Sequence, residues 1–242
     1  MGGLGRVGLA LLVAGAAALG GVLTEKTARL PGTLTDKRDG KTYRTVVIGN
    51  KRWMAENMNY KTPDTSWCYD HDTSNCRKYG RLYDYNTALT VCPDGYRLPF
   101  SKEWSELGSE VEIDTYKKGG YMVFWHPKYS SFYGHVGEKL KAKSGWNDKG
   151  HYFADESKSG NGTDDYGFSA LPGGIYIYDG LYPGFYSGGN EGSWWAVADI
   201  ERDKDDLLYK YSWDIGTGGN LSEGYTSQSD SSAKSVRCVA DL

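Results

Sequence analysis

The chain has 242 residues, with 28 basic and 31 acidic side chains and a formal net charge of -3. This balance excludes the strongly basic surface that is typical of nucleic-acid-binding proteins. The 33 glycines occur beside 8 Trp, 20 Tyr and 6 Phe residues, which excludes a disordered chain, and they lack the three-residue period of collagen. We therefore expect one globular domain with short strands and many loops.

An apolar segment spans residues 7–23 near the N-terminus. It is shorter than the roughly 20 residues of a membrane-spanning helix, and its small residues offer the cleavage sites of a signal peptide. The alternative is an apolar N-terminal helix that stays on the mature protein. Residues 1–30 are predicted to be one or the other, and residues 31–242 a single domain. Both alternatives predict export, to the cell surface or the extracellular space.

The spacing of the four cysteines indicates disulfides rather than a zinc site, because no two of them form a C-x-x-C pair. Two disulfides allow three connectivities. Cys68 and Cys76 flank a short polar loop, which favours a local bridge between them. Cys92 would then pair with Cys238 and tie an early segment to the end of the chain. Such bridges are typical of exported proteins.

The first predicted elements are two strands of a β-hairpin, over residues 41–48 and 52–55, joined by Gly49-Asn50. Helices are predicted over 82–89, 101–111 and, as a short turn, 137–143. Ser101 stands where an N-cap residue is expected, and Glu103 lies early in that helix, where the helix dipole favours it.

From residue 166 onward the pattern changes to short strands and Gly-rich turns. In the segment 175–178 two isoleucines alternate with two tyrosines, which predicts a strand with one apolar and one aromatic face. Asp179-Gly180 then offers a hairpin turn. Residues 235–239 are predicted to form the final strand.

Several motifs occur in a fixed order along the chain: 36–43 (DKRDGKTY), 48–60 (IGNKRWMAENMNY), 79–83 (YGRLY), 92–99 (CPDGYRLP), 165–174 (DYGFSALPGG) and 236–239 (VRCV). Together they resemble the Fibrobacter succinogenes major paralogous domain, a family of exported bacterial proteins. Residues 96–99, Glu103-Trp104 and Trp194-Trp195 are also similar to the C-type lectin-like fold, which includes formylglycine-generating-enzyme-like domains. The resemblance implies an α+β domain with a twisted antiparallel sheet, two short helices, long Gly-rich loops and joined termini, preceded here by the apolar N-terminal helix.

The candidate ligand-binding residues are aromatic, because aromatic rings stack on sugars or anchor a protein partner. Trp53 and Trp104 are assigned to the core. Adjacent residues of a strand point to opposite faces, so either Trp194 or Trp195 is expected to reach a surface groove. The alternative for the tyrosines is that they fill gaps beneath loops. The candidates are Tyr176, Tyr178, Tyr182, Phe185, Tyr186 and Trp194.

No metal or cofactor is predicted. Residues 146–148 resemble the Trp-Asn-Asp triplet that holds calcium in sugar-binding lectins, but the chain lacks the partner triplets Glu-Pro-Asn and Gln-Pro-Asp. The acidic residues at 201–206 and Asp164-Asp165 could bind calcium weakly, and solvated loops are the more common use of such runs. The four histidines lack metal-binding spacings and no nucleophile motif is present, so an enzyme is not expected.

The sequence therefore predicts an exported, non-enzymatic binding or adhesion module at the cell surface. Its partner would be carbohydrate or a surface protein, and not nucleic acid. The alternative is a structural subunit of an extracellular filament that assembles through residues 7–23.

Overall fold

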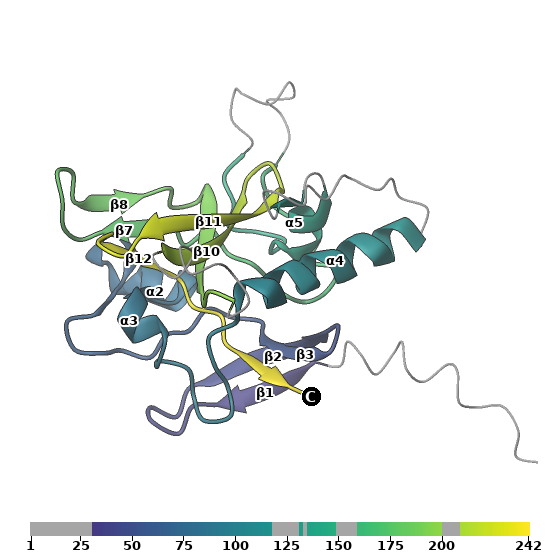
Figure 1. Ribbon diagram of the computed structural model, residues 1–242, viewed down its shortest axis with the longest axis horizontal. Coiled ribbons are helices and arrows are strands. Elements are labelled where there is room, and N and C mark those ends of the chain that lie inside the picture. Colours follow the sequence, from purple (N-terminus) through teal and green to yellow (C-terminus); the bar gives the residue numbers. More distant parts are fainter. Residues whose placement is uncertain (1–30, 118–130, 133–134, 149–158, 200–208) are drawn as a thin grey trace, which may run out of the picture.

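The computed structural model describes residues 31–117, 131–132, 135–148, 159–199 and 209–242. The apolar segment 7–23 and the acidic run 201–206 lie outside these residues. The described residues form an α+β fold dominated by three antiparallel sheets, which confirms the predicted class (Figure 1). The helices are η1 (Tyr69–His71), α2 (Thr73–Tyr79), α3 (Tyr85–Ala88), α4 (Ser101–Lys117) and α5 (His135–Leu140).

The first sheet has the order β1-β2-β3-β13, the second β6-β11-β10-β9 and the third β4-β5-β12-β7-β8. Their strands are, in chain order, β1 (Gly32–Thr35), β2 (Thr42–Ile48), β3 (Lys51–Met54), β4 (Ser66–Trp67), β5 (Leu82–Asp84), β6 (Ser131–Phe132), β7 (Ile175–Ile177), β8 (Gly184–Tyr186), β9 (Glu191–Ala196), β10 (Tyr209–Gly216), β11 (Leu221–Ser227), β12 (Ser232–Lys234) and β13 (Val239–Asp241).

The first sheet joins the start of the described chain to its end. The predicted hairpin is confirmed, because β2 pairs with β3 in antiparallel register. The last strand, β13, adds to the other edge of β3, opposite Trp53. The disulfides Cys68–Cys76 and Cys92–Cys238 are both present, as predicted, and the second fastens residue 92 beside β13.

The helix predicted over 101–111 is present and longer, but its N-terminus is built differently. The Ser101 hydroxyl accepts a hydrogen bond from Trp213 Nε1 at 2.7 Å and does not cap the helix. The cap is Asp199, whose carboxylate accepts from the Lys102 N–H at 3.0 Å. The short helix expected at 137–143 lies two residues earlier, as α5.

The prediction of a helix over 82–89 was wrong for the first half of that segment. Residues 82–84 form β5, because Tyr83 is fully buried and its backbone pairs with β12. Only residues 85–88 are helical. Asp84 ends the strand and starts this helix, since its carboxylate accepts from the Thr87 N–H at 2.7 Å.

The prediction of the final strand over 235–239 was also wrong. This segment is extended but crosses between sheets, so its backbone bonds to several partners in turn. Ser235 donates to the Ser193 carbonyl of β9, and the Val236 carbonyl accepts from Met58. Regular pairing resumes only in β13.

The core is rich in tryptophan. Trp53 and Trp104 are fully buried, as predicted, with ring centroids 5.0 Å apart. Trp194 and Trp195 are both fully buried too, so the expectation that one of them reaches a surface groove was wrong. They do point to opposite faces of β9, but each face is covered: Trp194 joins the larger hydrophobic cluster and Trp195 the smaller one.

Arg237 is a fully buried cation in the crossing segment. Its guanidinium donates to carbonyl oxygens of Met54, Phe168 and Ser169 and to Asn57 Oδ1. Burial lowers the pKa of Arg237 to about 9, so the side chain stays protonated at neutral pH. One residue therefore holds together three segments that are distant in sequence.

Candidate functional site

The third sheet carries most of the partly exposed aromatic rings. Residues that pair directly across strands share a face, and the register pairs Tyr176 of β7 with Phe185 of β8 on one side and with Ala233 of β12 on the other. The rings of Tyr176 and Phe185 stack at 4.2 Å with an interplanar angle of 15°. Because Ala233 is small, Trp67 of β4 reaches Tyr176 across the sheet, at 5.3 Å.

Tyr178 extends this group beyond the end of β7. Its ring stacks on Trp67 at 5.1 Å, again with a 15° interplanar angle. Tyr176, Tyr178, Phe185 and Trp67 are all half-buried. Each ring therefore has one side packed and one part in contact with solvent. They form a continuous aromatic surface across the third sheet, from β4 to β8, rather than isolated side chains.

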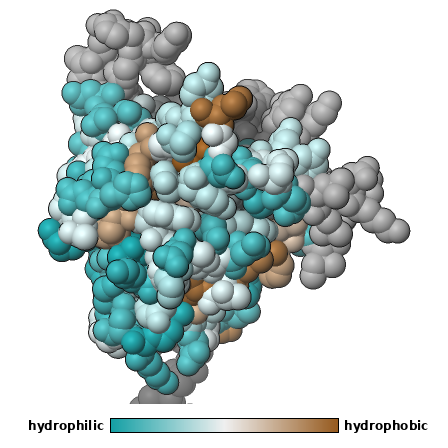
Figure 2. Space-filling model, turned by 90° about the vertical axis from the view of Figure 1, so that its left-hand side faces the viewer, coloured by the Kyte–Doolittle hydropathy of each residue, from teal (hydrophilic) through white to brown (hydrophobic). Residues whose placement is uncertain are grey.

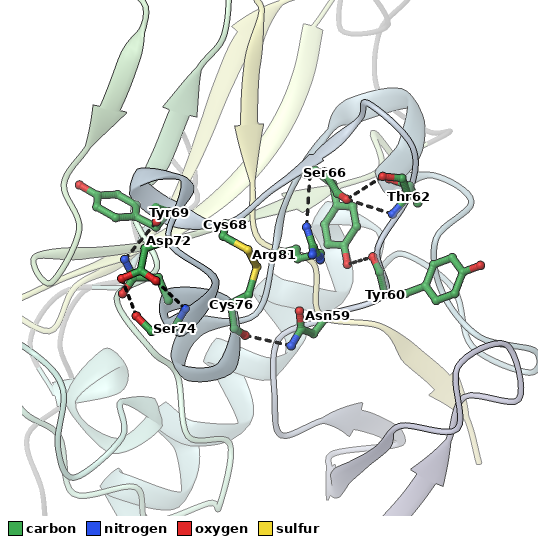
Figure 3. The surroundings of a disulfide bond; sticks show 12 residues. Asn59, Tyr60, Thr62, Ser66, Cys68, Tyr69, Asp72, Ser74, Cys76 and Arg81 are labelled. Atoms are coloured by element: carbon green, nitrogen blue, oxygen red, sulfur yellow. Dashed lines mark hydrogen bonds between the residues drawn. A yellow bond between two sulfur atoms is a disulfide. The ribbon is translucent and has the colours of Figure 1, made fainter.

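The disulfide loop adds two more rings. Cys68–Cys76 closes a loop in which Asp72 caps α2 by accepting from the Ser74 N–H at 2.7 Å (Figure 3). His71 has a left-handed backbone, with φ of 56°, which is uncommon for a residue other than glycine. In this conformation its ring contacts Phe185 edge-on at 4.9 Å. Tyr69 contacts Phe185 at 5.2 Å. We call Trp67, Tyr69, His71, Tyr176, Tyr178 and Phe185 the aromatic face.

Glycines at the two ends of the β7–β8 hairpin explain how the disulfide loop packs against that hairpin. The Tyr69 ring lies against Gly174 and Gly188, where an added Cβ atom would come within 2.7 and 2.4 Å of ring atoms. The Tyr69 hydroxyl also accepts a hydrogen bond from the Gly188 N–H at 3.1 Å. These two glycines are therefore required by close packing of the ring, and not only by the shape of their own turns.

Substitution of Gly188 by Ala should displace Tyr69 and lower the free energy of unfolding by about 1–3 kcal/mol, because the new methyl group overlaps the ring. Urea denaturation measures this. The control is Gly216→Ala, where the added Cβ meets no atom within 4 Å. Equal stability losses in the two variants would show that Tyr69 is not held in this way.

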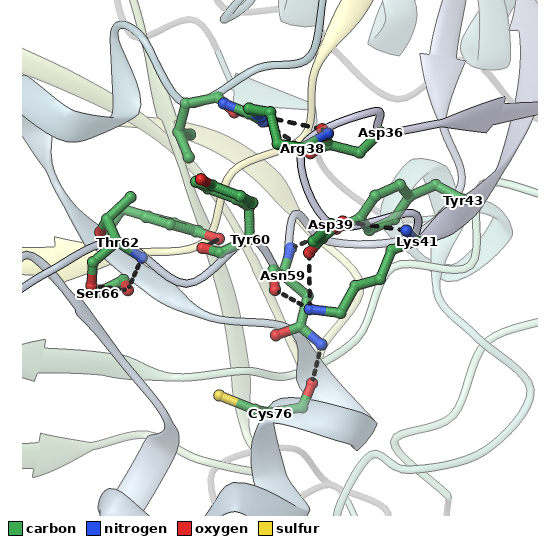
Figure 4. A network of polar contacts seen from close by, with 12 residues as sticks. Asp36, Arg38, Asp39, Lys41, Tyr43, Asn59, Tyr60, Thr62, Ser66 and Cys76 are labelled. Atoms are coloured by element: carbon green, nitrogen blue, oxygen red, sulfur yellow. Dashed lines mark hydrogen bonds and ion pairs between the residues drawn. The ribbon is translucent and has the colours of Figure 1, made fainter.

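A polar network fixes the loop from its other end. Asn59 Nδ2 donates to the Cys76 carbonyl at 2.9 Å, and the Tyr83 hydroxyl donates to the Tyr60 carbonyl at 2.8 Å. Arg38 packs over the Tyr60 ring and bonds to buried Asp36 (Figure 4). The Arg38 hydrogen bond lowers the pKa of the Asp36 carboxyl despite its burial. The first sheet thus positions the segment that leads into the aromatic face.

Comparison with known proteins decides the family. Residues 46–240 match the Fibrobacter succinogenes major domain, Fib_succ_major, over most of the chain. The chain belongs to this family. Neither a curated protein sequence nor a solved structure is significantly similar to it. The match runs from β2 into β13, so the aromatic face and both disulfides lie within the Fib_succ_major domain. Two disulfides fit an extracellular protein.

The sequence-predicted site residues are only partly brought together in this Fib_succ_major domain. Tyr176, Tyr178 and Phe185 meet on the aromatic face. Tyr182 and Tyr186 lie on the same hairpin, 78% and 40% exposed, where the Tyr186 hydroxyl donates to the Tyr182 carbonyl. Trp194 is enclosed in the core and donates to Asn57 Oδ1, so it cannot contact a ligand at the surface.

Sequence reasoning missed the contribution of the disulfide loop. Trp67, Tyr69 and His71 were not predicted to join the tyrosines of the hairpin. The available signal was local: three rings flank or follow Cys68 at alternate positions, beside a predicted bridge. A disulfide-closed loop with aromatic residues at its root is a candidate contact surface.

The calcium candidates do not form a site in the described residues. Trp146 is buried and donates through Nε1 to the Ala170 carbonyl, while Asn147 bonds to Asn190. The Asp164 carboxylate already accepts from the N–H and hydroxyl of Ser169. Within the described ranges, no group of three metal-ligating side chains converges. No described helix is long and apolar enough to cross a membrane.

Proposed function

We propose that this Fib_succ_major domain is an exported, non-enzymatic binding module of the cell surface, with a C-type lectin-like fold, and that it contacts carbohydrate or a surface protein through the aromatic face. The observation that carries the proposal is the aromatic face itself. Six rings from two distant segments meet on one face of a sheet and stay partly exposed. Aromatic side chains contribute large contact areas at low entropic cost.

The fold part of the proposal is supported by the connection between the chain ends. The strands at the two ends of the described chain, β1 and β13, belong to one sheet, and Cys92–Cys238 reinforces this closure. The β7–β8 hairpin then lies away from the joined ends of the chain. In Figure 1, β7 and β8 lie at the left, far from the C-terminus.

The chemical character of that end also supports contact with polar ligands. Figure 2 shows it as mainly hydrophilic to neutral, with small separate hydrophobic areas. Tyrosine and tryptophan, which supply four of the six rings of the aromatic face, lie nearer the middle of the hydropathy scale than the aliphatic residues do, so they are pale rather than brown in such a view. Large apolar patches of the kind that obligate partners cover are not seen on this side.

The test is binding to a glycan array and to intact bacterial cells by the wild-type protein and by the double variant Tyr176→Ala/Tyr178→Ala. Loss of the signals, by about tenfold or more, is expected, because interface aromatics carry much of the binding energy. The matched control is Tyr209→Ala/Tyr225→Ala, which removes another exposed tyrosine pair, in contact at 5.3 Å on the second sheet. Unchanged binding by the first variant would contradict the proposal.

A further inference from the structure

Three aspartates stand around the outer end of the aromatic face. Asp179 follows Tyr178 directly, and Asp230 precedes Ser231, whose carbonyl accepts from the Tyr178 N–H at 2.9 Å. Asp84 pairs with Ala233, the residue that lies opposite Tyr176. Burial is the main cause that raises the pKa of Tyr178, and the three carboxylates raise it further. Each aspartate also belongs to the third sheet or to a turn that leaves it. The end of the aromatic face at Tyr178 is therefore electronegative.

These carboxylates are held in place by the backbone. One oxygen of each accepts from a main-chain N–H: Thr87 for Asp84 at 2.7 Å, Gly180 for Asp179 at 2.8 Å and Ser232 for Asp230 at 2.9 Å. The second oxygen of each forms no hydrogen bond with the described residues. Rigid acceptors with a free oxygen are prepared to bind a donor without losing further side-chain entropy.

One cation lies close to this charge, because Lys210 Nζ donates to the main-chain carbonyl of Asp230 at 2.6 Å. Arg77 and Lys78 of α2 line a separate hollow of about 190 Å³ together with Lys41. Arg81 donates to the Ser66 carbonyl. Among the described residues, no lysine or arginine forms an ion pair with Asp84, Asp179 or Asp230. Lys210 thus offsets part of the charge at Asp230, and most of the negative charge is left for a partner.

The ring geometry favours a side chain over a sugar. Trp67 with Tyr178, and Tyr176 with Phe185, stack face to face, so each ring has one face covered by its neighbour. His71 and Trp67 contact Tyr176 as well. A flat sugar needs a broad free ring face, whereas the alkyl stem of lysine or arginine packs along such rings with its charge beyond them.

We propose that the aromatic face binds a basic segment of a partner protein, whose lysine or arginine side chains lie across the rings and donate to the free oxygens of Asp84, Asp179 and Asp230. This inference rests on the proposed function, since it assigns a partner class to the same surface. The argument for this occupant is charge complementarity: an aromatic surface with three carboxylates at one end, none of them in an ion pair with a described residue, selects positive charge and repels acidic partners.

The probe is a short synthetic peptide of alternating lysine and serine, labelled for fluorescence anisotropy. The comparison peptides have every lysine acetylated, which removes the charge and keeps the stem, or replaced by glutamate. Binding is expected for the lysine peptide alone, and it should weaken as salt is raised.

The decisive variant is Asp84→Asn/Asp179→Asn/Asp230→Asn, because asparagine keeps the acceptor that bonds to the backbone and removes the charge. It should weaken peptide binding about ten- to hundredfold. The control, Asp94→Asn/Glu106→Gln/Glu110→Gln, changes net charge equally at exposed positions outside the aromatic face. Tyr176→Ala/Tyr178→Ala should also weaken binding.

Several results would overturn the inference. One is equal weakening by the two charge variants, which means non-specific electrostatics. Others are equal binding of the acetylated peptide, or no binding of the lysine peptide even at low salt. If the aromatic face instead binds a glycan, with sensitivity to Tyr176→Ala/Tyr178→Ala and none to the asparagine variant, the charge inference fails while the proposed function stands.

Discussion

Replacement of Arg237 by methionine is expected to lower the free energy of unfolding by about 3–5 kcal/mol. Methionine fills much of the space but donates no hydrogen bond. The Asn57 side-chain oxygen and the carbonyls of Met54, Phe168 and Ser169 would then lose a donor inside the protein. The contact of the guanidinium with the Phe168 ring, at 4.4 Å, is lost as well.

The control is Arg237→Lys, which keeps a cation with three donors but cannot reach all four acceptors at once. Arg237→Lys should lower the free energy of unfolding by less than Arg237→Met does. Urea denaturation at neutral pH, where wild-type Arg237 is protonated, gives both values. A loss below about 1 kcal/mol for Arg237→Met would be ordinary for a surface position and would contradict the assigned role.

Removal of the Cys92–Cys238 disulfide by Cys92→Ser/Cys238→Ser should cost about 5 kcal/mol in the chain-entropy view, because its closed loop is long, with a sequence separation of 146. Cys238 is fully buried next to Arg237, so the serine hydroxyl adds a desolvation cost. Thermal and urea unfolding under non-reducing conditions measure the difference.

The matched comparison is Cys68→Ser/Cys76→Ser, which opens a loop with a separation of only 8 residues. The same entropy argument predicts about half the loss for this bridge. Its larger effect should be on binding, since the loop carries Tyr69 and His71 and begins directly after Trp67. A greater stability loss for the short loop than for the long one would contradict the assignment of Cys92–Cys238 as the main closure of the fold.

Local patterns in the sequence predicted the elements that local interactions determine. The hairpin of β2 and β3 follows from β-branched residues around Gly49-Asn50, and helix α4 from its apolar spacing. Both disulfides followed from spacing. The elements that failed are those decided by distant partners. Tyr83 forms a strand because β12 lies beside it, and residues 235–238 form no strand because their partners lie in different sheets.

The residues of the candidate site were likewise predicted where local patterns determine them and missed where distant partners do. Alternation of isoleucine and tyrosine placed Tyr176 and Tyr178 on one face, and the structure adds Phe185 from the next strand. No local pattern reports that Trp67, more than 100 residues earlier, reaches these rings across Ala233. Trp194 failed as a candidate because strand alternation gives the direction of a side chain but not whether another layer covers it.

The most direct test of the aromatic face is the affinity of Trp67→Ala for whichever ligand the glycan array, the cells or the lysine peptide provides. Trp67 joins the disulfide loop to the hairpin, through contacts with both Tyr176 and Tyr178. It is half-buried, so its loss should leave the fold intact. We predict an affinity at least about tenfold weaker, with cooperative unfolding retained. Wild-type affinity in a folded Trp67→Ala variant would contradict the assignment of this surface as the binding site.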